Sequence, residues 1–354
     1  MSYYNLKIHI NLPSQIKNIF IIKKLIPFCN NKLDQIPYYF TRNIEYGPII
    51  NLYVQCSERV ITYIYSELYN QFNQFIDNLK AAEKSANKVY IERYNDLKRM
   101  NGIKNKKPQD NLTIMFYKLN NIERHGEYGS EQEKYLFTKY YFLSQNRVEK
   151  TIQFFNKIPE QERLGTVLGL FTACSQLLDD TGKGHGYLSF KSHLLGFLSY
   201  KHKDMPKYEQ LFKNNFDKNK DVYWEIVKIA KDDQQLHDLR KDQPLFDMIY
   251  EWKKIYTEMY EDMLTVIKEN PPKQNVLVMF KKNLRFAQYR SLSYFHKKAF
   301  ANSNKTFFDS PEFQAYRMVV NYVYQTLPTL GISSRKRVEM SYVLVHTMEG
   351  GVRK

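Results

Sequence analysis

Apolar positions recur along the chain with two different periods. In the first third, alternating apolar and polar residues predict short strands at residues 4–12, 38–42, 49–55 and 111–119. After residue 130, apolar residues spaced three and four apart predict helices almost throughout. We therefore expect one α+β domain over residues 1–354, with short antiparallel strands within 1–119 and mainly helices within 120–354.

Prolines, glycines and capping side chains mark where the expected helices begin and end. Residues 14–26 are expected to form a short helix that Pro27 ends. Ser57 is expected to cap a long amphipathic helix. The many charged residues between 187 and 243 predict several short helices.

The stretch from Ser310 to Glu349 combines the strongest helical pattern with polar side chains. Ser310 precedes Pro311, which is the arrangement of an N-cap followed by proline at the first helical position. A proline and a glycine near residue 330 stop this helix, and a second helix follows, so the stretch predicts a helical hairpin. Tyr316 lies six residues after Ser310, so its phenol projects from the side of the first helix.

Positive charge dominates the composition. Lys and Arg number 53 against 37 Asp and Glu, a formal net charge of +16, which favours an acidic peptide, RNA or an anionic surface as partner. Positive charge gathers at Lys80–Lys107, with nine Lys or Arg against three Asp or Glu, and at Gln274–Lys298 among aromatic residues. Such runs are more often solvated helix faces, but either one could dock an acidic leader peptide.

Motifs for metals, nucleotides and export do not occur in the sequence. The three cysteines, Cys29, Cys56 and Cys174, are far apart and form no zinc-like spacing, which fits a reducing cytoplasm. The glycine-rich segment 179–186 lacks the spacing of a phosphate loop. No signal sequence or membrane-spanning run is present, so we expect a cytoplasmic protein without cofactor or metal.

Three stretches carry a resemblance to a known family. They are the pattern S-x5-Y-R, V-N-x2-Y-x2-L-x2-L-G, R and H-x2-E near the C-terminus, and the segments 38–54 and 120–144. Together they resemble the thiopeptide pyridine synthases, which are relatives of the glutamate-elimination domain of class I lantibiotic dehydratases. The second strand of the family's first hairpin usually carries basic residues, whereas this chain has Ile49, Ile50 and Asn51. Their loss favours the pyridine-synthase branch over the eliminating branch.

The resemblance implies an elimination-domain-like fold and a reaction without cofactor. Pyridine synthases join two dehydroalanines of a modified precursor peptide in a formal four-plus-two aza-cycloaddition, then lose water and expel the leader peptide. By position in the motif, Ser310 and Tyr316 are expected to form hydrogen bonds with the reacting amide and to transfer protons there. Glu123 and Arg124 are second candidates, for deprotonation and for anchoring a peptide carbonyl. The expected partner is a precursor with an acidic leader and a dehydroalanine-containing core, and neither nucleic acid nor membrane is expected.

Plainer interpretations of the same residues stay open. Ser310 can be only a helix cap, Tyr316 only a core ring, and Glu123 with Arg124 only a local ion pair. The chain can also be a lyase that eliminates glutamate, an aminoacyl-tRNA-dependent peptide ligase of the same superfamily, or a non-catalytic protein that binds peptide or RNA. Oligomeric state, precursor and ring size are not determined by the sequence.

Overall fold

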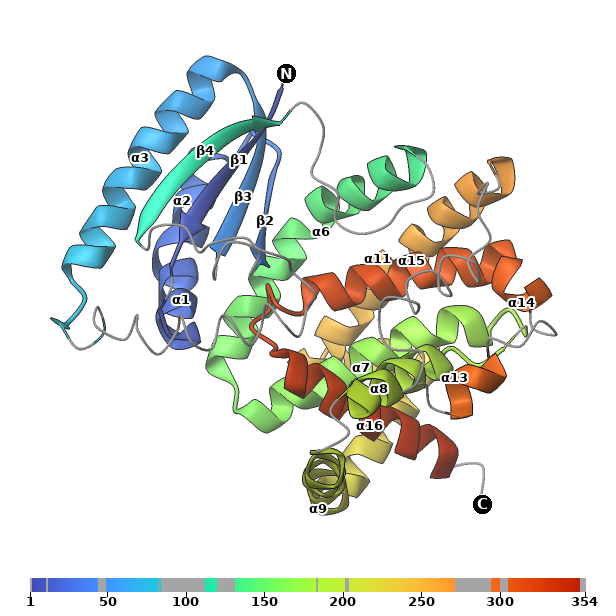
Figure 1. The fold of residues 1–354 in the computed structure, drawn as a ribbon. Helices are drawn as coiled ribbons and strands as arrows, with labels where there is room; N and C mark the ends of the chain where they lie inside the picture. The colour runs from blue at the N-terminus through green and yellow to red at the C-terminus, as the bar shows by residue number, and fades with distance from the viewer. Residues whose placement is uncertain are drawn as a thin grey trace. The chain divides into compact units, whose positions relative to one another are not determined.

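The computed structural model describes residues 2–10, 12–43, 49–81, 83, 112–119, 131–182, 184–200, 204–270, 294–299 and 305–350. The chain forms two compact units, drawn with their helices and strands in Figure 1. The first unit comprises Met1–His125, Tyr141–Phe154 and Pro328–Gly331, and the second comprises Gly126–Tyr140, Phe155–Leu327 and Ile332–Lys354. The architecture is α+β, with a small sheet near the N-terminus and mainly helices thereafter, as expected. The expectation of a single domain stays a prediction.

A four-stranded antiparallel sheet forms the base of the first unit. Its strands are β1 (Ser2–His9), β2 (Tyr38–Asn43), β3 (Ile49–Cys56) and β4 (Thr113–Leu119), in the order β2-β3-β1-β4. All four predicted strands are confirmed, with their ends shifted by a few residues. Leu6 and Ile8 of the central strand β1 are fully buried, so alternation along β1 builds one side of the core.

The helices of the first unit correct one expectation. A helical run passes from α1 (Ser14–Phe20) through a π-helical turn, η1 (Ile21–Leu25), into α2 (Ile26–Lys32), so the prediction that Pro27 ends the helix is wrong. Pro27 lies in the first turn of α2, where a missing backbone N–H is tolerated. The preceding turn is wider, with the N–H of Ile26 bonded to the carbonyl of Ile21, and this spacing relieves the clash that proline causes in a regular helix. The long helix α3 (Glu58–Asp77) follows Ser57, as predicted, but the Ser57 side chain makes no capping hydrogen bond, so the expected cap is wrong.

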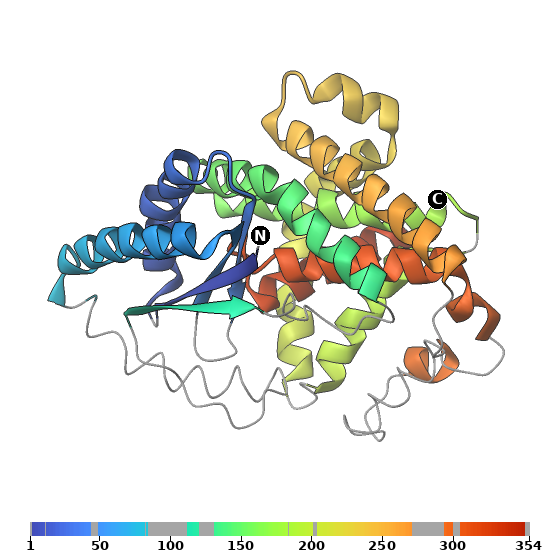
Figure 2. The same ribbon diagram turned by 90° about the horizontal axis from the view of Figure 1, so that it is seen from above.

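A buried central helix organises the second unit. In α7 (Glu160–Asp179) every residue from Leu164 to Leu178 is buried, because helices pack against it on several sides. A Cβ on Gly169 would lie 2.1 Å from Ile249 Cδ1, so glycine is required for the close approach of a neighbouring helix. Figure 2 shows the helices from above. They are α6 (Glu131–Lys157), α8 (Tyr187–Tyr200), α9 (Met205–Lys231), α10 (Asp233–Leu239), α11 (Pro244–Glu269), α13 (Tyr294–Ala299), α14 (Lys305–Asp309), α15 (Pro311–Thr326) and α16 (Ser334–Gly350).

The region expected to hold several short helices contains α8, α9 and α10, of which α9 is long. Helix α9 has 27 residues and bends at Asn219, whose φ of −122° and ψ of 17° are not helical. The Asn219 side-chain amide donates to the Asn215 carbonyl at 2.9 Å, which offers the backbone an alternative to the regular helical bond. Charged residues misled the sequence interpretation, because they occupy the exposed side of a helix whose other side buries Phe212 and Phe216.

Helices α15 and α16 follow each other across a short turn but do not pack as the predicted hairpin, because α15 lies against α7 and α11 whereas α16 lies against α7, α8 and α9. The turn between them contains Gly331, whose φ of 84° lies in the left-handed region that glycine adopts readily. Helix α16 is buried on most sides, including the polar residues Ser341 and Thr347. Within the described part of the chain, no helix has both the length and the apolar character that a membrane crossing requires.

Candidate functional site

The side chain of Ser310 caps α15, as the sequence predicts. Its Oγ accepts a hydrogen bond from the backbone N–H of Phe313 at 3.3 Å and donates one to the carbonyl of Phe307 at 2.8 Å. Pro311 occupies the first helical turn. The hydroxyl is half-buried at the positive end of the helix dipole, so it can face an anionic or carbonyl group only by giving up one of these local bonds.

Tyr316 lies further along the same helix and is fully buried. Its hydroxyl donates to the backbone carbonyl of Gly186 at 2.6 Å. Burial raises the pKa of the phenol well above its usual value, with a contribution from the nearby Cys174 thiol, while Ser189 acts in the opposite direction. The phenol is therefore a protonated donor whose hydrogen is already used inside the protein.

Gly186, whose carbonyl accepts this hydrogen bond, lies against the end of α7. Its backbone N–H donates to Oδ1 of Asp179 at 2.7 Å. A Cβ at this position would lie 2.1 Å from the Ser175 carbonyl oxygen, so no other residue fits without moving the backbone. The segment between Asp179 and Gly186 is thus fastened at its end by Asp179, by Tyr316 and by close contact with α7.

The same segment forms one wall of a cavity of about 1040 Å³. Trp224, Lys228 and Lys231 of α9 line another wall, and the end of α16 contributes Thr347 and Met348. An aromatic ring beside side chains of both charges can accommodate a peptide segment, and the volume is at the upper end for a ligand site. The hydrogen bond of Tyr316 therefore fixes a wall of a cavity, although Tyr316 itself does not line it.

A cluster of polar side chains, separate from Ser310 and Tyr316, lies near the C-terminal end of α15. The ring of Tyr324 is 4.6 Å from the ring of His193, measured between centroids, with 32° between their planes. The guanidinium of Arg337 is 5.1 Å from the centroid of the Tyr324 ring. These three residues, here called the His193 cluster, come from α8, α15 and α16 and are each half-buried. The Tyr324 hydroxyl itself is shielded from solvent, so a ligand reaches it only after neighbouring side chains move.

The charges around the His193 cluster fix its protonation at neutral pH. Burial lowers the pKa of His193 to about 3, helped by the positive charges of Arg337 and Arg317. Burial raises the pKa of the Tyr324 phenol, partly offset by Arg337 and by the hydroxyl of Ser341. At neutral pH a neutral imidazole thus lies beside a protonated phenol. The lowered pKa of His193 makes it a weak base and the raised pKa of Tyr324 makes it a weak acid, so both groups are suited to hydrogen bonding.

Sequence reasoning missed the His193 cluster. It singled out neither Tyr324 nor His193. The available signal was a polar interruption, Lys191-Ser192-His193, inside an otherwise apolar helical stretch. That signal does not predict which distant residue His193 contacts, because α8, α15 and α16 come together only in the folded protein.

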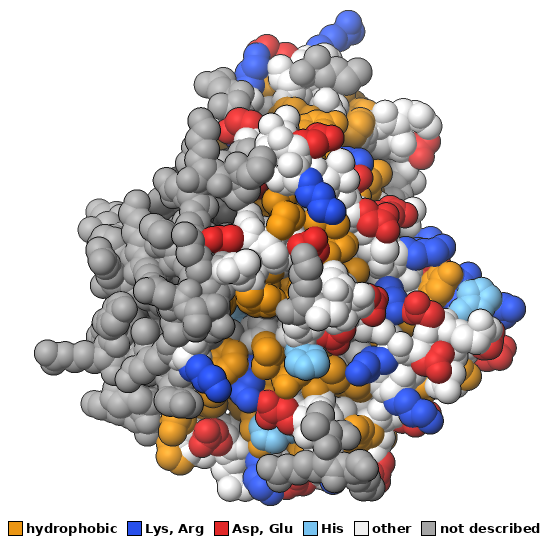
Figure 3. Space-filling view, turned by 90° about the vertical axis from the view of Figure 1, so that its right-hand side faces the viewer, with side chains coloured by type: hydrophobic (Ala, Val, Ile, Leu, Met, Phe, Trp, Pro, Cys, Tyr) orange, Lys and Arg blue, Asp and Glu red, His pale blue; other side chains and the backbone are white. Residues whose placement is uncertain are grey.

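Glu123 and Arg124 lie outside the described residues, so their roles stay predictions. The two basic stretches, Lys80–Lys107 and Gln274–Lys298, also lie largely outside them. On the face shown in Figure 3, Lys and Arg side chains of the described residues lie among Asp and Glu side chains and form no single patch. The positive charge of the chain is therefore not concentrated on the described part of this face.

The remaining candidates for chemistry are metal ligands and cysteine thiols. Within the described ranges, no group of three or more His, Cys, Asp or Glu side chains is arranged to hold a metal ion. Cys29, Cys56 and Cys174 are buried and carry free thiols. Burial raises the pKa of Cys29 and Cys174, so both are unreactive thiols at neutral pH.

Comparison with known proteins identifies the fold. No protein-family model matches the sequence, and no curated protein matches it. The pyridine synthase TbtD from thiomuracin biosynthesis superposes with a TM-score of 0.70 at 15% identity, over 99% of this chain and 100% of that one. TsrL superposes with a TM-score of 0.63 at 12% identity, over 99% of this chain and 95% of that one. The resemblance inferred from the motifs is confirmed for the fold, which extends over the whole chain.

Proposed function

We propose that this chain is an enzyme of thiopeptide biosynthesis that builds a pyridine ring from two dehydroalanines of a modified precursor peptide. The observation that carries the proposal is the full-length fold similarity to a pyridine synthase. The S-x5-Y motif supports it, because Ser310 and Tyr316 lie where the family pattern expects a serine and a tyrosine. The imidazole and the phenol of the His193 cluster give the same unit groups suited to hydrogen-bonding a peptide amide.

The reaction needs no oxidant or reductant. The amide nitrogen of one dehydroalanine passes to the iminol form with the carbonyl before it, so that alkene and C=N make an azadiene. This diene adds to the alkene of the second dehydroalanine, forming two carbon–carbon bonds. Loss of water and then of the leader peptide, which leaves as its carboxamide, introduces the remaining two double bonds of the pyridine.

Each step requires a proton to move, and the described residues can hydrogen-bond the groups between which it moves. In our proposal, the neutral ring of His193 accepts a hydrogen bond from the N–H of the reacting amide. The Tyr324 hydroxyl, once a side-chain movement exposes it, donates a hydrogen bond to the carbonyl oxygen of that amide.

Ser310 and Tyr316 lie nearer the start of α15, too far away to contact the same amide. In our proposal they hydrogen-bond the amide of the second dehydroalanine, after the Tyr316 hydroxyl exchanges the Gly186 carbonyl for substrate. Glu123 and Arg124 are kept as further candidates, for the later deprotonation and for anchoring a peptide carbonyl.

Positioning supplies the other part of the rate enhancement. Two alkenes must be held face to face, and well-oriented intramolecular reactions gain up to about 7–11 kcal/mol from such alignment. Partly buried groups on three packed helices suit this task, because their rotamers are fixed by neighbours. The proposed chemistry therefore uses only side chains of the protein.

Incubation of the purified protein with a dehydroalanine-containing precursor, without ATP or tRNA, tests the proposal by mass spectrometry. We expect a macrocycle lacking the leader, together with the released leader. Glutamate release from a glutamylated precursor would identify a lyase instead, and a requirement for ATP and aminoacyl-tRNA would identify a ligase. A folded protein that binds the precursor without converting it would be a binding protein, contrary to the proposal.

A further inference from the structure

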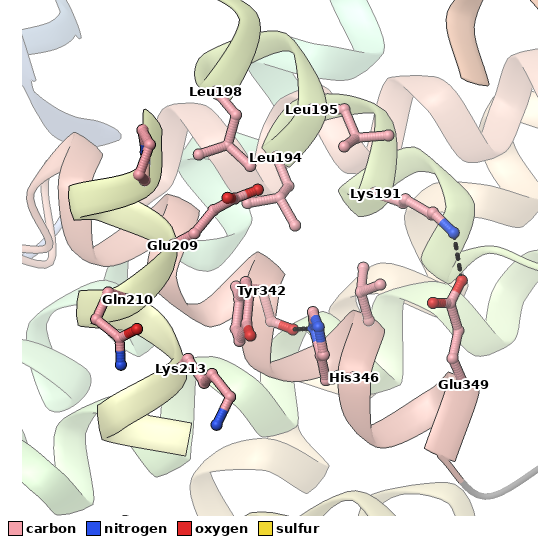
Figure 4. A pocket seen from close by; sticks show the side chains of 12 residues that line it. Lys191, Leu194, Leu195, Leu198, Glu209, Gln210, Lys213, Tyr342, His346 and Glu349 are labelled. Atoms are coloured by element: carbon pink, nitrogen blue, oxygen red, sulfur yellow. Dashed lines mark hydrogen bonds and ion pairs between the residues drawn. The ribbon is translucent and has the colours of Figure 1, made fainter. Parts of the chain in front are cut away.

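A second cavity, of about 520 Å³, lies between α8, α9 and α16 (Figure 4). Its interior is apolar, with Leu194, Leu195 and Leu198 from α8 and Val345 from α16. Leu195 is half-buried and the other three are buried, so the cavity offers a preformed apolar floor that solvent reaches through its mouth. None of the residues placed in the proposed chemistry lines it.

The mouth of this cavity carries paired charges of both signs. Glu209, Gln210 and Lys213 lie along the α9 side, and Lys191 forms an ion pair with Glu349 on the other side (Figure 4). Lys213 is also paired, with an aspartate one turn further along its own helix. The two lysines and two glutamates of the lining balance, in contrast to the strongly basic chain as a whole.

The α16 side of the cavity presents a stacked pair of rings. The rings of Tyr342 and His346 lie 3.8 Å apart, measured between centroids, and are 20° from parallel. Nδ1 of His346 is 3.0 Å from the Tyr342 carbonyl oxygen, so it donates there (Figure 4). The neutral ring then has Nε2 as a hydrogen-bond acceptor on an exposed side chain at the cavity.

We infer that this cavity binds one aliphatic or aromatic side chain of the precursor peptide, while His346 and Gln210 hydrogen-bond the backbone beside it. An apolar floor under a rim of donors and acceptors is the pattern of peptide recognition by an anchor residue. Balanced charge does not suit RNA, whose binding depends on excess cations. The inference rests on the proposed function only for the identity of the peptide.

The inference separates this contact from electrostatic docking on the basic stretches. Burial of an apolar side chain is insensitive to moderate salt, whereas attraction between opposite charges is screened. The anchor contact should therefore persist from about 50 to 500 mM salt. A precursor can use both contacts, and their salt dependence tells them apart.

Methyl-resolved NMR of the full chain tests the site with simple probes. The probes are acetyl-Ala-Leu-Ala-amide, its phenylalanine analogue and its glutamate analogue. We expect the leucine and phenylalanine peptides to shift the methyl signals of Leu194, Leu195, Leu198 and Val345 at low and at high salt. Absence of these shifts, or equal shifts with the glutamate peptide, would overturn the inference.

Two variants and one control complete the test. Leu195→Asp places a carboxylate in the apolar floor and should weaken probe binding at least tenfold, while His346→Ala removes an exposed acceptor and should weaken it about fivefold. Leu211→Asp is the control, because Leu211 is 44% exposed on α9 and does not line the cavity. Wild-type binding in both cavity variants would overturn the inference.

Turnover distinguishes the failure of this inference from failure of the proposed function. With the dehydroalanine-containing precursor, Leu195→Asp should raise KM at least tenfold, with the loss in KM rather than kcat, and Leu211→Asp should match wild type. Normal ring formation with an unchanged KM in Leu195→Asp would overturn the proposed peptide binding in the cavity and leave the proposed function intact. Probe binding is measured without turnover, so it holds or fails independently of ring formation.

Discussion

Two tyrosines of α15, about two helical turns apart, have opposite surroundings. Tyr316 is fully buried and its hydroxyl donates to the Gly186 carbonyl. Tyr324 is half-buried and its ring lies between His193 and Arg337. The tyrosine that the motif singles out thus serves the fold already, whereas Tyr324 faces two ionisable side chains. Position in a motif identifies a neighbourhood, and hydrogen bonding and exposure indicate which groups in it can reach substrate.

The largest expected effect comes from His193. We expect His193→Ala to slow ring formation by roughly 10³, because the variant loses the proposed hydrogen-bond acceptor at the amide. The measurement is single-turnover mass spectrometry, with circular dichroism to check the fold. His237→Ala is the matched control, since His237 is exposed on α10. Equal rates in the two variants would remove His193 from the mechanism.

A pair of phenylalanine variants sharpens the comparison. Tyr316→Phe removes one of two hydrogen bonds to the buried Gly186 carbonyl, which also accepts from the N–H of Ser189 at 3.0 Å. It should therefore cost about 0.5–1.5 kcal/mol of unfolding free energy and slow the reaction by roughly 10². Tyr324→Phe should slow the reaction by a similar factor while stability stays within about 0.5 kcal/mol of wild type. Urea denaturation alongside the rate assay measures both. Unchanged stability in Tyr316→Phe would contradict the anchoring role, and wild-type turnover would remove its hydroxyl from the chemistry.

Ser310 can be tested for capping and chemistry separately. Ser310→Ala should cost about 1 kcal/mol of stability through the lost cap and slow ring formation by roughly 10². Ser310→Asn caps the helix without a hydroxyl, so it should restore the stability but not the rate. If Ser310→Asn restores both, the serine is only a helix cap.

The pH dependence of stability tests the burial of His193 without any turnover. Because the folded state lowers the pKa of His193 to about 3 from the ordinary 6.5, the unfolded chain binds the proton more readily between these values. The free energy of unfolding should therefore be level above about pH 6.5 and fall as the pH drops toward 3, by at most about 1.4 kcal/mol per pH unit from this group. His193→Phe should show a shallower fall, and an unchanged slope would contradict the burial of a neutral imidazole.

Local signals were readable in the sequence, and contacts between distant segments were not. The capping role of Ser310 depends on its immediate neighbours, and the structure confirms it. Pro27 misled the prediction because a π-helical turn, which has no simple sequence signal, precedes it. The contact of Gly186 with α7 depends on tertiary approach. The contact between His193 and Tyr324 also depends on tertiary approach. The periodicity of the sequence therefore could not predict either contact.

The most direct test of the proposed ring formation follows the two amide nitrogens. A precursor is prepared with ¹⁵N in one dehydroalanine at a time and incubated with the purified protein. Our account predicts that the nitrogen of the diene-forming dehydroalanine remains in the pyridine, while the nitrogen of the other leaves as the carboxamide of the leader, in amounts equal to the macrocycle. Leader released without the second label, or unchanged precursor in the presence of folded protein, would contradict the account.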